Sequence, residues 1–194
     1  MPIRSALPED AAAIAAVHVR SWQAAYRDLL PRAYLDSLDV DERAAVWAAR
    51  LAEPQAPGVL VAAEDGAAGQ VVGFCCFRAW PGEERDAGTA EGPGEGPDAG
   101  TDDRLDPATT GEIAALYVVP EVWGSGVGRG LLAASEEALV VDGFQDAALW
   151  VLADNARGRR FYEAAGWRPD GTVVQDTTAG RALDELRYRR RLFA

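Results

Sequence analysis

The sequence predicts one α/β (α+β) domain in which helices pack against a single mixed sheet. Three observations predict this fold class. The chain has 194 residues, 48% of them hydrophobic, which suffices for one sizeable core. Strand-like and helix-like segments alternate along the chain, as they do in domains built around one sheet. A glycine-rich stretch, PEVWGSGVGRGLL, joins one such strand to one such helix.

The first half of the chain is expected to contain a strand, two helices and two further strands, at residues 3–6, 8–26, 41–51, 59–63 and 71–77. Pro8 suits the first turn of the first helix because it has no N–H to satisfy, and the acids that follow it favour the positive end of the helix. Asp41 is the expected cap of the second helix. A turn with the sequence EDGAAG would join the last two strands.

The second half is expected to contain four strands and two helices. A strand at 112–118 precedes the glycine-rich stretch, and a helix over 128–141 follows it. The later elements are a strand, a helix and two closing strands, at residues 148–153, 156–165, 172–175 and 186–192. One core can hold all of these elements, so we expect a single domain over residues 1–194.

Residues 81–111 have the composition of a loop inserted between two strands. They contain seven glycines, nine acidic residues and two arginines, and their net charge is −7 against −12 for the whole chain. Such a segment buries too little apolar surface to offset the entropy lost on ordering it. We therefore predict a flexible acidic insertion. A linker between two domains and a lid over a substrate are the alternatives.

The composition excludes several classes of function. The net charge of −12 disfavours nucleic acids and anionic membranes as partners, and no apolar run approaches the roughly 20 residues of a membrane-spanning helix. All 19 basic residues are arginine, so sites that need lysine, such as a P-loop or a Schiff base, are excluded. Adjacent Cys75 and Cys76 are interpreted as reduced core thiols, and no metal site is expected. The start of the chain lacks the apolar centre of a signal peptide, so we expect a cytoplasmic protein.

The glycine-rich stretch predicts an anion site. The first turn of a helix has unpaired N–H groups and a partial positive charge, and glycines let a phosphate approach the backbone. The dinucleotide fingerprint G-x-G-x-x-G fits from Gly124 except that Arg129 replaces its third glycine. The pattern [Q/R]-x-x-G-x-[G/A] fits better, with Trp123 at its first position and Gly126 and Gly128 as its glycines.

That pattern resembles the pyrophosphate loop of the GNAT superfamily of acetyl-CoA-dependent N-acetyltransferases. A later stretch, LWVLADNARGRRFYEAAGWRPDG, has the family's Asn-(x)6-Tyr spacing from Asn155 to Tyr162 and then the pair Gly166-Trp167. The opening AAVHVRSWQAAYRDLLP is similar to the first helix and loop of many bacterial members. The resemblance covers nearly the whole chain outside residues 81–111.

Two residues depart from the family pattern. Trp123 stands where arginine or glutamine is usual, which removes one side-chain donor and leaves the backbone of the loop. Gly158 stands where alanine is common, which weakens its helix slightly. The resemblance implies the GNAT fold, a central mixed and mostly antiparallel twisted sheet flanked by about four helices.

The resemblance further implies that acetyl-CoA, the co-substrate, binds between two splayed strands. Its pantetheine arm would pair with the backbone like an added strand and would contact Asn155, which is equally suited to be a helix N-cap. The residues implied in cofactor binding are Leu116, Tyr117, Val118, Gly124, Ser125, Gly126, Val127, Gly128, Arg129 and Asn155. We expect one or two of four arginines near the helix starts to contact phosphate, namely Arg129, Arg157, Arg159 and Arg160.

Acyl transfer from a thioester to an amine needs a base for the amine and an acid for the departing thiolate. The resemblance implies Tyr162 as the acid, with a half-buried structural aromatic as the alternative. Glu112 is the candidate base, acting directly or through water, and a solvent-facing carboxylate at a strand end is the alternative. The position that some other members use for a base holds Trp150, which cannot serve.

Trp22 and Tyr26 are the candidate acceptor-binding residues. They share one helix face, where aromatic rings can line a pocket for an apolar or cationic amine. At this spacing an aromatic pair is equally a feature of a core. His18, the only histidine, is interpreted as structural.

The sequence as a whole predicts an N-acetyltransferase that moves an acetyl group from acetyl-CoA to a primary amine of a small molecule or peptide, by direct attack in a ternary complex. The alternative is a non-catalytic GNAT-like module that binds acyl-CoA as a sensor or scaffold, and a longer acyl donor is also open. The acidic charge favours a cationic small molecule among the acceptors. A homodimer, common in the family, is an open alternative to a monomer.

Overall fold

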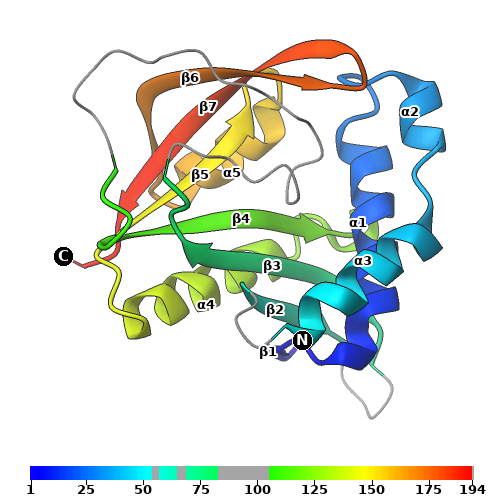
Figure 1. Ribbon diagram of the computed structural model, residues 1–194, viewed down its shortest axis with the longest axis horizontal. Helices are drawn as coiled ribbons and strands as arrows, with labels where there is room; N and C mark the ends of the chain where they lie inside the picture. The colour runs from blue at the N-terminus through cyan, green and yellow to red at the C-terminus, as the bar shows by residue number, and fades with distance from the viewer. Residues whose placement is uncertain (54–56, 65–68, 83–104, 194) are drawn as a thin grey trace. The chain divides into compact units, whose positions relative to one another are not determined.

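The computed structural model describes residues 1–53, 57–64, 69–82 and 105–193. Within these ranges it contains five α-helices and seven strands (Figure 1). The helices are α1 (Ala11–Ala25), α2 (Arg32–Asp36), α3 (Val40–Ala52), α4 (Val127–Val141) and α5 (Ala156–Ala164), with short 3-10 helices η1 (Pro8–Asp10) and η2 (Pro120–Val122). The strands are β1 (Ile3–Ser5), β2 (Gly58–Ala63), β3 (Val71–Ala79), β4 (Thr110–Val118), β5 (Asp146–Leu152), β6 (Arg168–Thr178) and β7 (Arg181–Arg191).

The strands form one sheet in the order β1-β2-β3-β4-β5-β7-β6. The pairs β1–β2, β2–β3, β5–β7 and β6–β7 are antiparallel, whereas β4 and β5 run parallel over Thr110–Glu112 and Asp146–Ala148. The predicted fold class, a mixed and mostly antiparallel sheet with flanking helices, is confirmed. The described residues hold five α-helices rather than about four, because the five-residue helix α2 was not predicted.

The predicted cap of α3 was wrong by two residues. Asp39, not Asp41, precedes this helix, and its carboxylate accepts hydrogen bonds from the N–H groups of Asp41 and Glu42 at 2.8 and 2.9 Å. Asp41 instead lies in the first turn, where its negative charge still favours the helix. The middle of the predicted EDGAAG turn, residues 65–68, lies outside the described residues.

The chain divides into two compact units. The first unit comprises Met1–Phe77 and Ala115–Ser135, and the second comprises Arg78–Ala114 and Glu136–Ala194. Strand β4 and helix α4 each run from one unit into the other. The single domain predicted over 1–194 stays a prediction.

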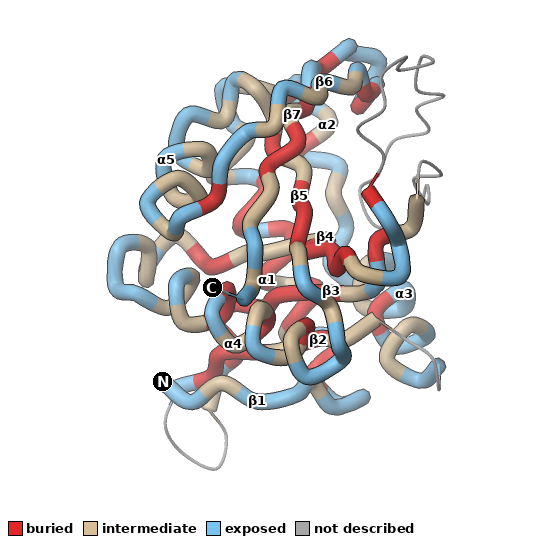
Figure 2. The backbone as a smooth tube through the Cα atoms, turned by 90° about the vertical axis from the view of Figure 1, so that its left-hand side faces the viewer, coloured by how far each residue is buried: buried red, intermediate tan, exposed pale blue. Residues whose placement is uncertain are grey.

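Strand β3 is the centre of the first unit, and its first seven residues are all buried (Figure 2). Neighbouring residues of a strand point to opposite faces. Phe74 faces α1 and α3, because its ring centroid lies 5.8 Å from that of His18 and 5.1 Å from that of Trp47. Gly73 faces α4, because a Cβ at this position would lie 3.1 Å from Leu131. The helices of the first unit therefore cover both faces of β3.

In the second unit, β4 and β5 likewise present two faces. Gly111 faces α4, since a Cβ there would lie 2.5 Å from Leu139. Ala148 of β5 points the other way and packs with Trp80 and Leu105. A side chain larger than glycine at residue 111 would displace the leucine, so this close approach positions α4 against β4.

The insertion predicted over 81–111 contains packed residues at its C-terminal end. Leu105 is buried, and residues 110 and 111 begin β4. Residues 83–104 lie outside the described residues, so the flexibility of the insertion stays a prediction. Cys75 and Cys76 are buried thiols, as predicted. Among the described residues, none of the helices has the length and apolar character needed to cross a membrane.

Candidate functional site

The glycine-rich stretch joins the end of β4 to the start of α4 within the first unit. Gly124 and Gly126 have φ values of +80° and +94°, and a Cβ at either position would meet no atom of the described residues within 4 Å. These glycines are therefore required by the backbone conformation and not by a lack of space. The N–H of Gly130 makes the first helical hydrogen bond, to the carbonyl of Gly126 at 2.9 Å. The N–H groups of residues 127–129 precede this bond and belong to the first turn of α4, where an anion can bind.

We expect Gly126→Ala to weaken binding of acetyl-CoA, the ligand that the family resemblance implies. An alanine in the left-handed conformation costs roughly 1–2 kcal/mol. The loop of the variant should therefore adopt a different backbone conformation, in which its N–H groups no longer face the ligand. Calorimetric titration with acetyl-CoA measures the effect. Gly180→Ala is the matched control, because Gly180 in the β6–β7 turn also has a positive φ, +74°, and open space around it. The control should lose similar stability and keep its affinity; equal affinity of Gly126→Ala and the wild type would contradict the conformational requirement.

Trp123 is a hydrogen-bond donor within the protein, which the sequence did not indicate. Its indole N–H donates to the carbonyl of Val118, the last residue of β4, at 2.7 Å. The hydroxyl of Ser21 on α1 donates to the same carbonyl at 3.0 Å. The side chain that replaces the usual arginine or glutamine is thus engaged with the protein's own backbone.

The end of β4 presents backbone groups on the side opposite β3. The N–H of Val119 donates to the carbonyl of Val72 on β3 at 2.9 Å. Successive residues of a strand direct their N–H and C=O groups to alternate sides. Leu116 and Val118 therefore direct theirs away from β3, while Tyr117 directs its own toward it.

Helix α5, in the second unit, begins at a side-chain cap. Asn155 is the N-cap, and its side-chain oxygen accepts a hydrogen bond from the N–H of Gly158 at 2.9 Å, which confirms that alternative from the sequence. A Cβ at Gly158 would lie 2.8 Å from the side-chain nitrogen of Asn155. The glycine that departs from the family pattern therefore has a packing reason: alanine would push the capping side chain away.

The other end of α5 is closed by a Schellman motif. Gly166 has a φ of +92°, and its N–H donates to the carbonyl of Glu163 at 3.1 Å. The N–H of Trp167 donates to the carbonyl of Tyr162 at 3.0 Å. This motif also brings the residues at its two ends into contact, and the rings of Tyr162 and Trp167 lie 6.2 Å apart edge to face. The Gly-Trp pair thereby fixes the backbone and the ring of Tyr162.

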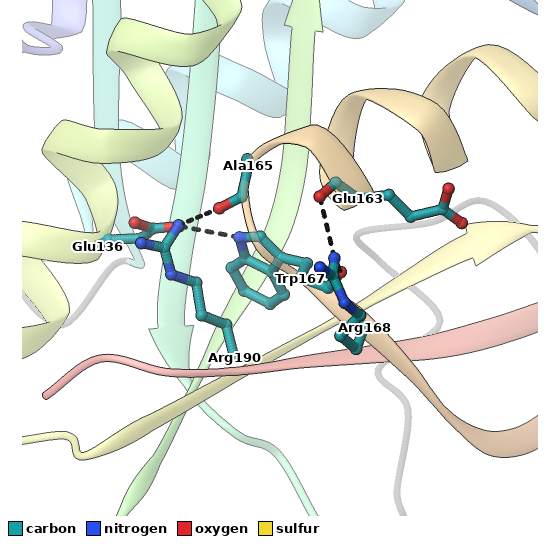
Figure 3. A network of polar contacts seen from close by, with 6 residues as sticks. All are labelled: Glu136, Glu163, Ala165, Trp167, Arg168 and Arg190. Carbon is teal, nitrogen blue, oxygen red and sulfur yellow. Dashed lines mark hydrogen bonds and ion pairs between the residues drawn. The ribbon is translucent and has the colours of Figure 1, made fainter. Parts of the chain in front are cut away.

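Trp167 is fully buried and belongs to a polar network (Figure 3). Its indole N–H donates to Glu136 on α4 at 2.8 Å, and Arg190 on β7 donates to the same carboxylate at 3.1 Å. Arg190 also donates to the carbonyl of Ala165, the C-cap of α5. Burial raises the pKa of Glu136, and the hydrogen bonds from Trp167 and Arg190 oppose that shift. The network holds the C-terminal end of α5 against α4 and β7.

The four arginines near the helix starts differ in their surroundings. Arg159 donates to the hydroxyl of Tyr188 at 3.2 Å and to the carbonyl of Ala153 at 3.1 Å, so it is engaged with its own unit. The side chains of the other three are exposed, namely Arg129, Arg157 and Arg160. The predicted contact of one or two of these four arginines with phosphate stays a prediction.

Glu112 is buried, so the alternative of a solvent-facing carboxylate is wrong. Its side chain is 9% exposed, and its carboxylate accepts a hydrogen bond from Nε of Arg78 at 2.7 Å. Ala148, the residue in register with Glu112, lies on the sheet face opposite α4, and Glu112 shares that face. A carboxylate buried this deeply is stable only with such a partner.

Trp22 and Tyr26 are in contact, with ring centroids 5.0 Å apart edge to face. Trp22 is buried, and its ring lies 5.5 Å from His18, which stacks on Tyr117 of β4 at 5.0 Å. Trp22 is thus part of the core of the first unit. Tyr26 is half-buried and is the member of the pair with exposed surface. Their role in binding an acceptor stays a prediction.

His18 is expected to remain neutral at pH values well below the usual pKa of a histidine side chain. Burial, with Arg43 and Arg50 nearby, lowers its pKa to about 3. An unfolded histidine binds its proton near pH 6.5, so between about pH 6.5 and 3 the unfolded state binds more protons than the native state. This group should therefore lower the stability by up to about 1.4 kcal/mol for each pH unit of acidification in that window. As the only histidine, it can be followed by NMR, and a titration midpoint near 6.5 in the folded protein would contradict its burial.

The predicted site residues fall in both units. The first unit holds the glycine-rich loop, the backbone of residues 116–118, and Trp22 and Tyr26. The second unit holds Glu112, Asn155 and Tyr162. Two residues that the sequence did not single out, Ser21 and Glu136, support these groups through bonds to distant parts of the chain.

Comparison with known proteins identifies the family. A family model described as the acetyltransferase (GNAT) family matches residues 19–167. The chain belongs to this family. It is 33% identical over 186 residues to the uncharacterised N-acetyltransferase YuaI of Bacillus subtilis (strain 168), and the match covers 95% of this chain and 89% of YuaI.

Solved structures share the GNAT fold. The yncA protein of Salmonella typhimurium, solved with its cofactor acetyl-CoA, has a TM-score of 0.66 at 24% identity and covers 100% of this chain and 95% of its own. The PaiA N-acetyltransferase of Thermoplasma acidophilum, solved in complex with coenzyme A, has a TM-score of 0.68 at 18% identity, with 98% of both chains covered. The matched region of this GNAT acetyltransferase begins on α1 and ends at Trp167, so it includes the loop, Glu112, Asn155 and Tyr162.

Proposed function

We propose that this GNAT acetyltransferase moves an acetyl group from acetyl-CoA to the primary amine of a small molecule or peptide. One observation carries the proposal: Gly124 and Gly126 adopt left-handed conformations directly before the 15-residue helix α4. The N–H groups and the dipole of such a helix start suit a pyrophosphate. Family membership makes the pyrophosphate of CoA the candidate anion. The proposed contacts come from residues 124–129, with Arg129 supplying a positive charge.

The pantetheine arm would pair with the end of β4. Leu116 and Val118 direct their backbone groups away from β3 and are the proposed partners. The carbonyl of Val118 accepts two protein hydrogen bonds, so Val118 would contribute its N–H. Tyr117 would contribute through its side chain. The cap uses the oxygen of Asn155, so a contact of Asn155 to pantetheine would come from its NH2 group.

The proposed chemistry is direct attack of the amine on the thioester. The amine nitrogen forms a bond to the carbonyl carbon, the carbon–sulfur bond breaks, and the amine gives up one proton. Tyr162 would protonate the departing thiolate, for which a phenol, neutral at pH 7, is suited. A phenol fixed by the Schellman motif loses little freedom when the reaction begins.

Glu112 is the proposed base. Its carboxylate is paired with Arg78 at 2.7 Å, and the ionised form of a carboxylic acid is the one that accepts a proton. Because the carboxylate is buried, a water molecule would carry the proton from the amine to it. Trp22 and Tyr26 are the proposed acceptor contacts, with Tyr26 offering the exposed ring.

Calorimetric titration with acetyl-CoA tests the proposal, with NAD and ATP as controls. Selective binding of acetyl-CoA supports it, and a screen of primary amines for acetyl transfer then follows. A folded protein that does not bind acetyl-CoA would overturn it. Binding without transfer to any amine would favour the alternative of a non-catalytic acyl-CoA-binding module.

A further inference from the structure

The carbonyl of Val118 is held by two side chains from different parts of the chain. Trp123 reaches it from the loop that follows β4, and Ser21 reaches it from α1, 97 residues earlier in the sequence. Ser21 is only 2% exposed, so its bond is shielded from water. A carbonyl oxygen has two lone pairs and can accept both bonds at once. The last carbonyl of β4 is thereby tied to both α1 and the loop.

We propose that Ser21 and Trp123 are positioning residues, and that their clamp on the Val118 carbonyl holds the glycine-rich loop in its acetyl-CoA-binding conformation. The inference rests on the proposed function. Trp123 directly precedes Gly124. A fixed Trp123 side chain therefore fixes the position of the backbone just before the two left-handed glycines. The N–H of Trp123 also donates to the carbonyl of Pro120 at 3.1 Å, which closes the turn between the strand and the glycines.

The clamp explains how the loop keeps its shape without the usual arginine or glutamine. Within the part of the chain that the structure describes, a Cβ at Gly124 or Gly126 would meet open space, so packing at these positions does not impose their conformation. A glycine backbone has many accessible conformations, and one of them must be selected by other contacts. The two bonds to Val118 lie immediately upstream of the glycines and provide such a selection.

The clamp also links the glycine-rich loop, the proposed acetyl-CoA site, to α1, the helix that carries the residues proposed to bind the amine. Ser21 directly precedes Trp22 on α1. A change in α1 that moved Ser21 would weaken one of the two bonds on Val118. Binding of acetyl-CoA should therefore depend on Ser21, a residue of α1 whose hydroxyl donates to this carbonyl.

The test is calorimetric titration of single and double variants with acetyl-CoA. Trp123→Phe keeps an aromatic ring and removes the N–H, and Ser21→Ala removes the hydroxyl. If the loop is binding-competent only when clamped, the apparent Kd rises as the competent fraction falls. One neutral hydrogen bond contributes about 1 kcal/mol, so each variant should raise the Kd by about three- to tenfold. Because both donors share one acceptor, the change in the double variant should differ from the product of the single changes.

Two controls separate the clamp from a general structural role. Ser21→Thr keeps the hydroxyl and should retain the wild-type affinity that Ser21→Ala loses. Arg20→Gln removes the exposed ion pair between Arg20 and Glu121, which joins the same helix to the same loop, and should change the Kd by less than about twofold. Wild-type affinity in Trp123→Phe and Ser21→Ala, or a double change equal to the product, would overturn the inference. A wild-type protein that does not bind acetyl-CoA would instead overturn the proposed function.

Discussion

Tyr162→Phe is expected to lower kcat by about 10²–10⁴-fold, the usual contribution of a positioned acid. The change removes only the hydroxyl, and the phenyl ring can keep the contacts of Tyr162 with Trp167 and Tyr188. The Kd of acetyl-CoA should therefore stay within about twofold of the wild type, because the lost interaction belongs to the transition state. Release of the CoA thiol in the presence of an amine from the screen, followed with a thiol reagent, measures the rate.

Tyr188→Phe is the matched control for this prediction. Tyr188 is fully buried, and its hydroxyl donates to Glu163 at 2.8 Å. Burial raises the pKa of this phenol, and its partners lie within its own unit. Removal of the Tyr188 hydroxyl should lower the stability of the protein and leave kcat nearly unchanged. An unchanged kcat in Tyr162→Phe would remove Tyr162 from the mechanism, and equal losses in both variants would show that the hydroxyls act through structure.

Trp167→Ala is expected to lower the free energy of unfolding by about 3–5 kcal/mol, as large-to-small changes at fully buried aromatics do. The change leaves a cavity, removes the hydrogen bond to Glu136 and removes the ring that contacts Tyr162. Urea unfolding followed by far-UV circular dichroism measures the loss. Since the network in Figure 3 anchors the end of α5, kcat should also fall under conditions where the variant is folded.

Two further variants separate the contributions of Trp167. Trp167→Phe keeps most of the packing and leaves Glu136 without the indole N–H, so it should cost about 1–3 kcal/mol. Val141→Ala, at the end of α4 where the valine is 85% exposed, should change the stability by less than about 0.5 kcal/mol. A loss below about 1 kcal/mol in Trp167→Ala would contradict the assignment of Trp167 as an anchor.

The predicted features that the structure contains are local in the chain: the strand before the glycine-rich stretch, the helix start after it and the Asn155 cap. The glycine requirement arises within a few residues of Gly126, and a helix start needs only its own first turn. The Asn155 cap is also set by a short-range backbone rule. For that reason their positions could be predicted without knowledge of the tertiary fold.

The parts that the sequence did not predict depend on contacts between distant residues. The bond from Ser21 to Val118 spans 97 residues, and the pair of Arg78 and Glu112 spans 34. Neither can be found from spacing or composition. The pair with Arg78 allows Glu112 to be buried. Because the sequence did not indicate this pair, a solvent-facing carboxylate remained an alternative.

Strands β6 and β7 are longer than predicted for a related reason. β6 covers Arg168–Thr178 and β7 covers Arg181–Arg191, although β6 starts with the weak strand formers Pro169, Asp170 and Gly171 and β7 is rich in charged residues. The charges are paired within the unit: Arg187 donates to Asp170 at 2.6 Å, and both side chains are nearly buried. Ion pairing thus allows a strand where composition disfavours one.

Helix α5 has a fixed length because both of its ends are closed. Its nine residues lie between the side-chain cap of Asn155 and the left-handed Gly166. Each residue of a helix advances the chain by about 100° of rotation and 1.5 Å of rise. An insertion or deletion between Asn155 and Tyr162 would keep both caps and turn the phenol by roughly a quarter of a circle or more. The helix should therefore accept many substitutions on its exposed face but no change of length. The spacing between Asn155 and Tyr162 thus determines the direction in which the phenol points.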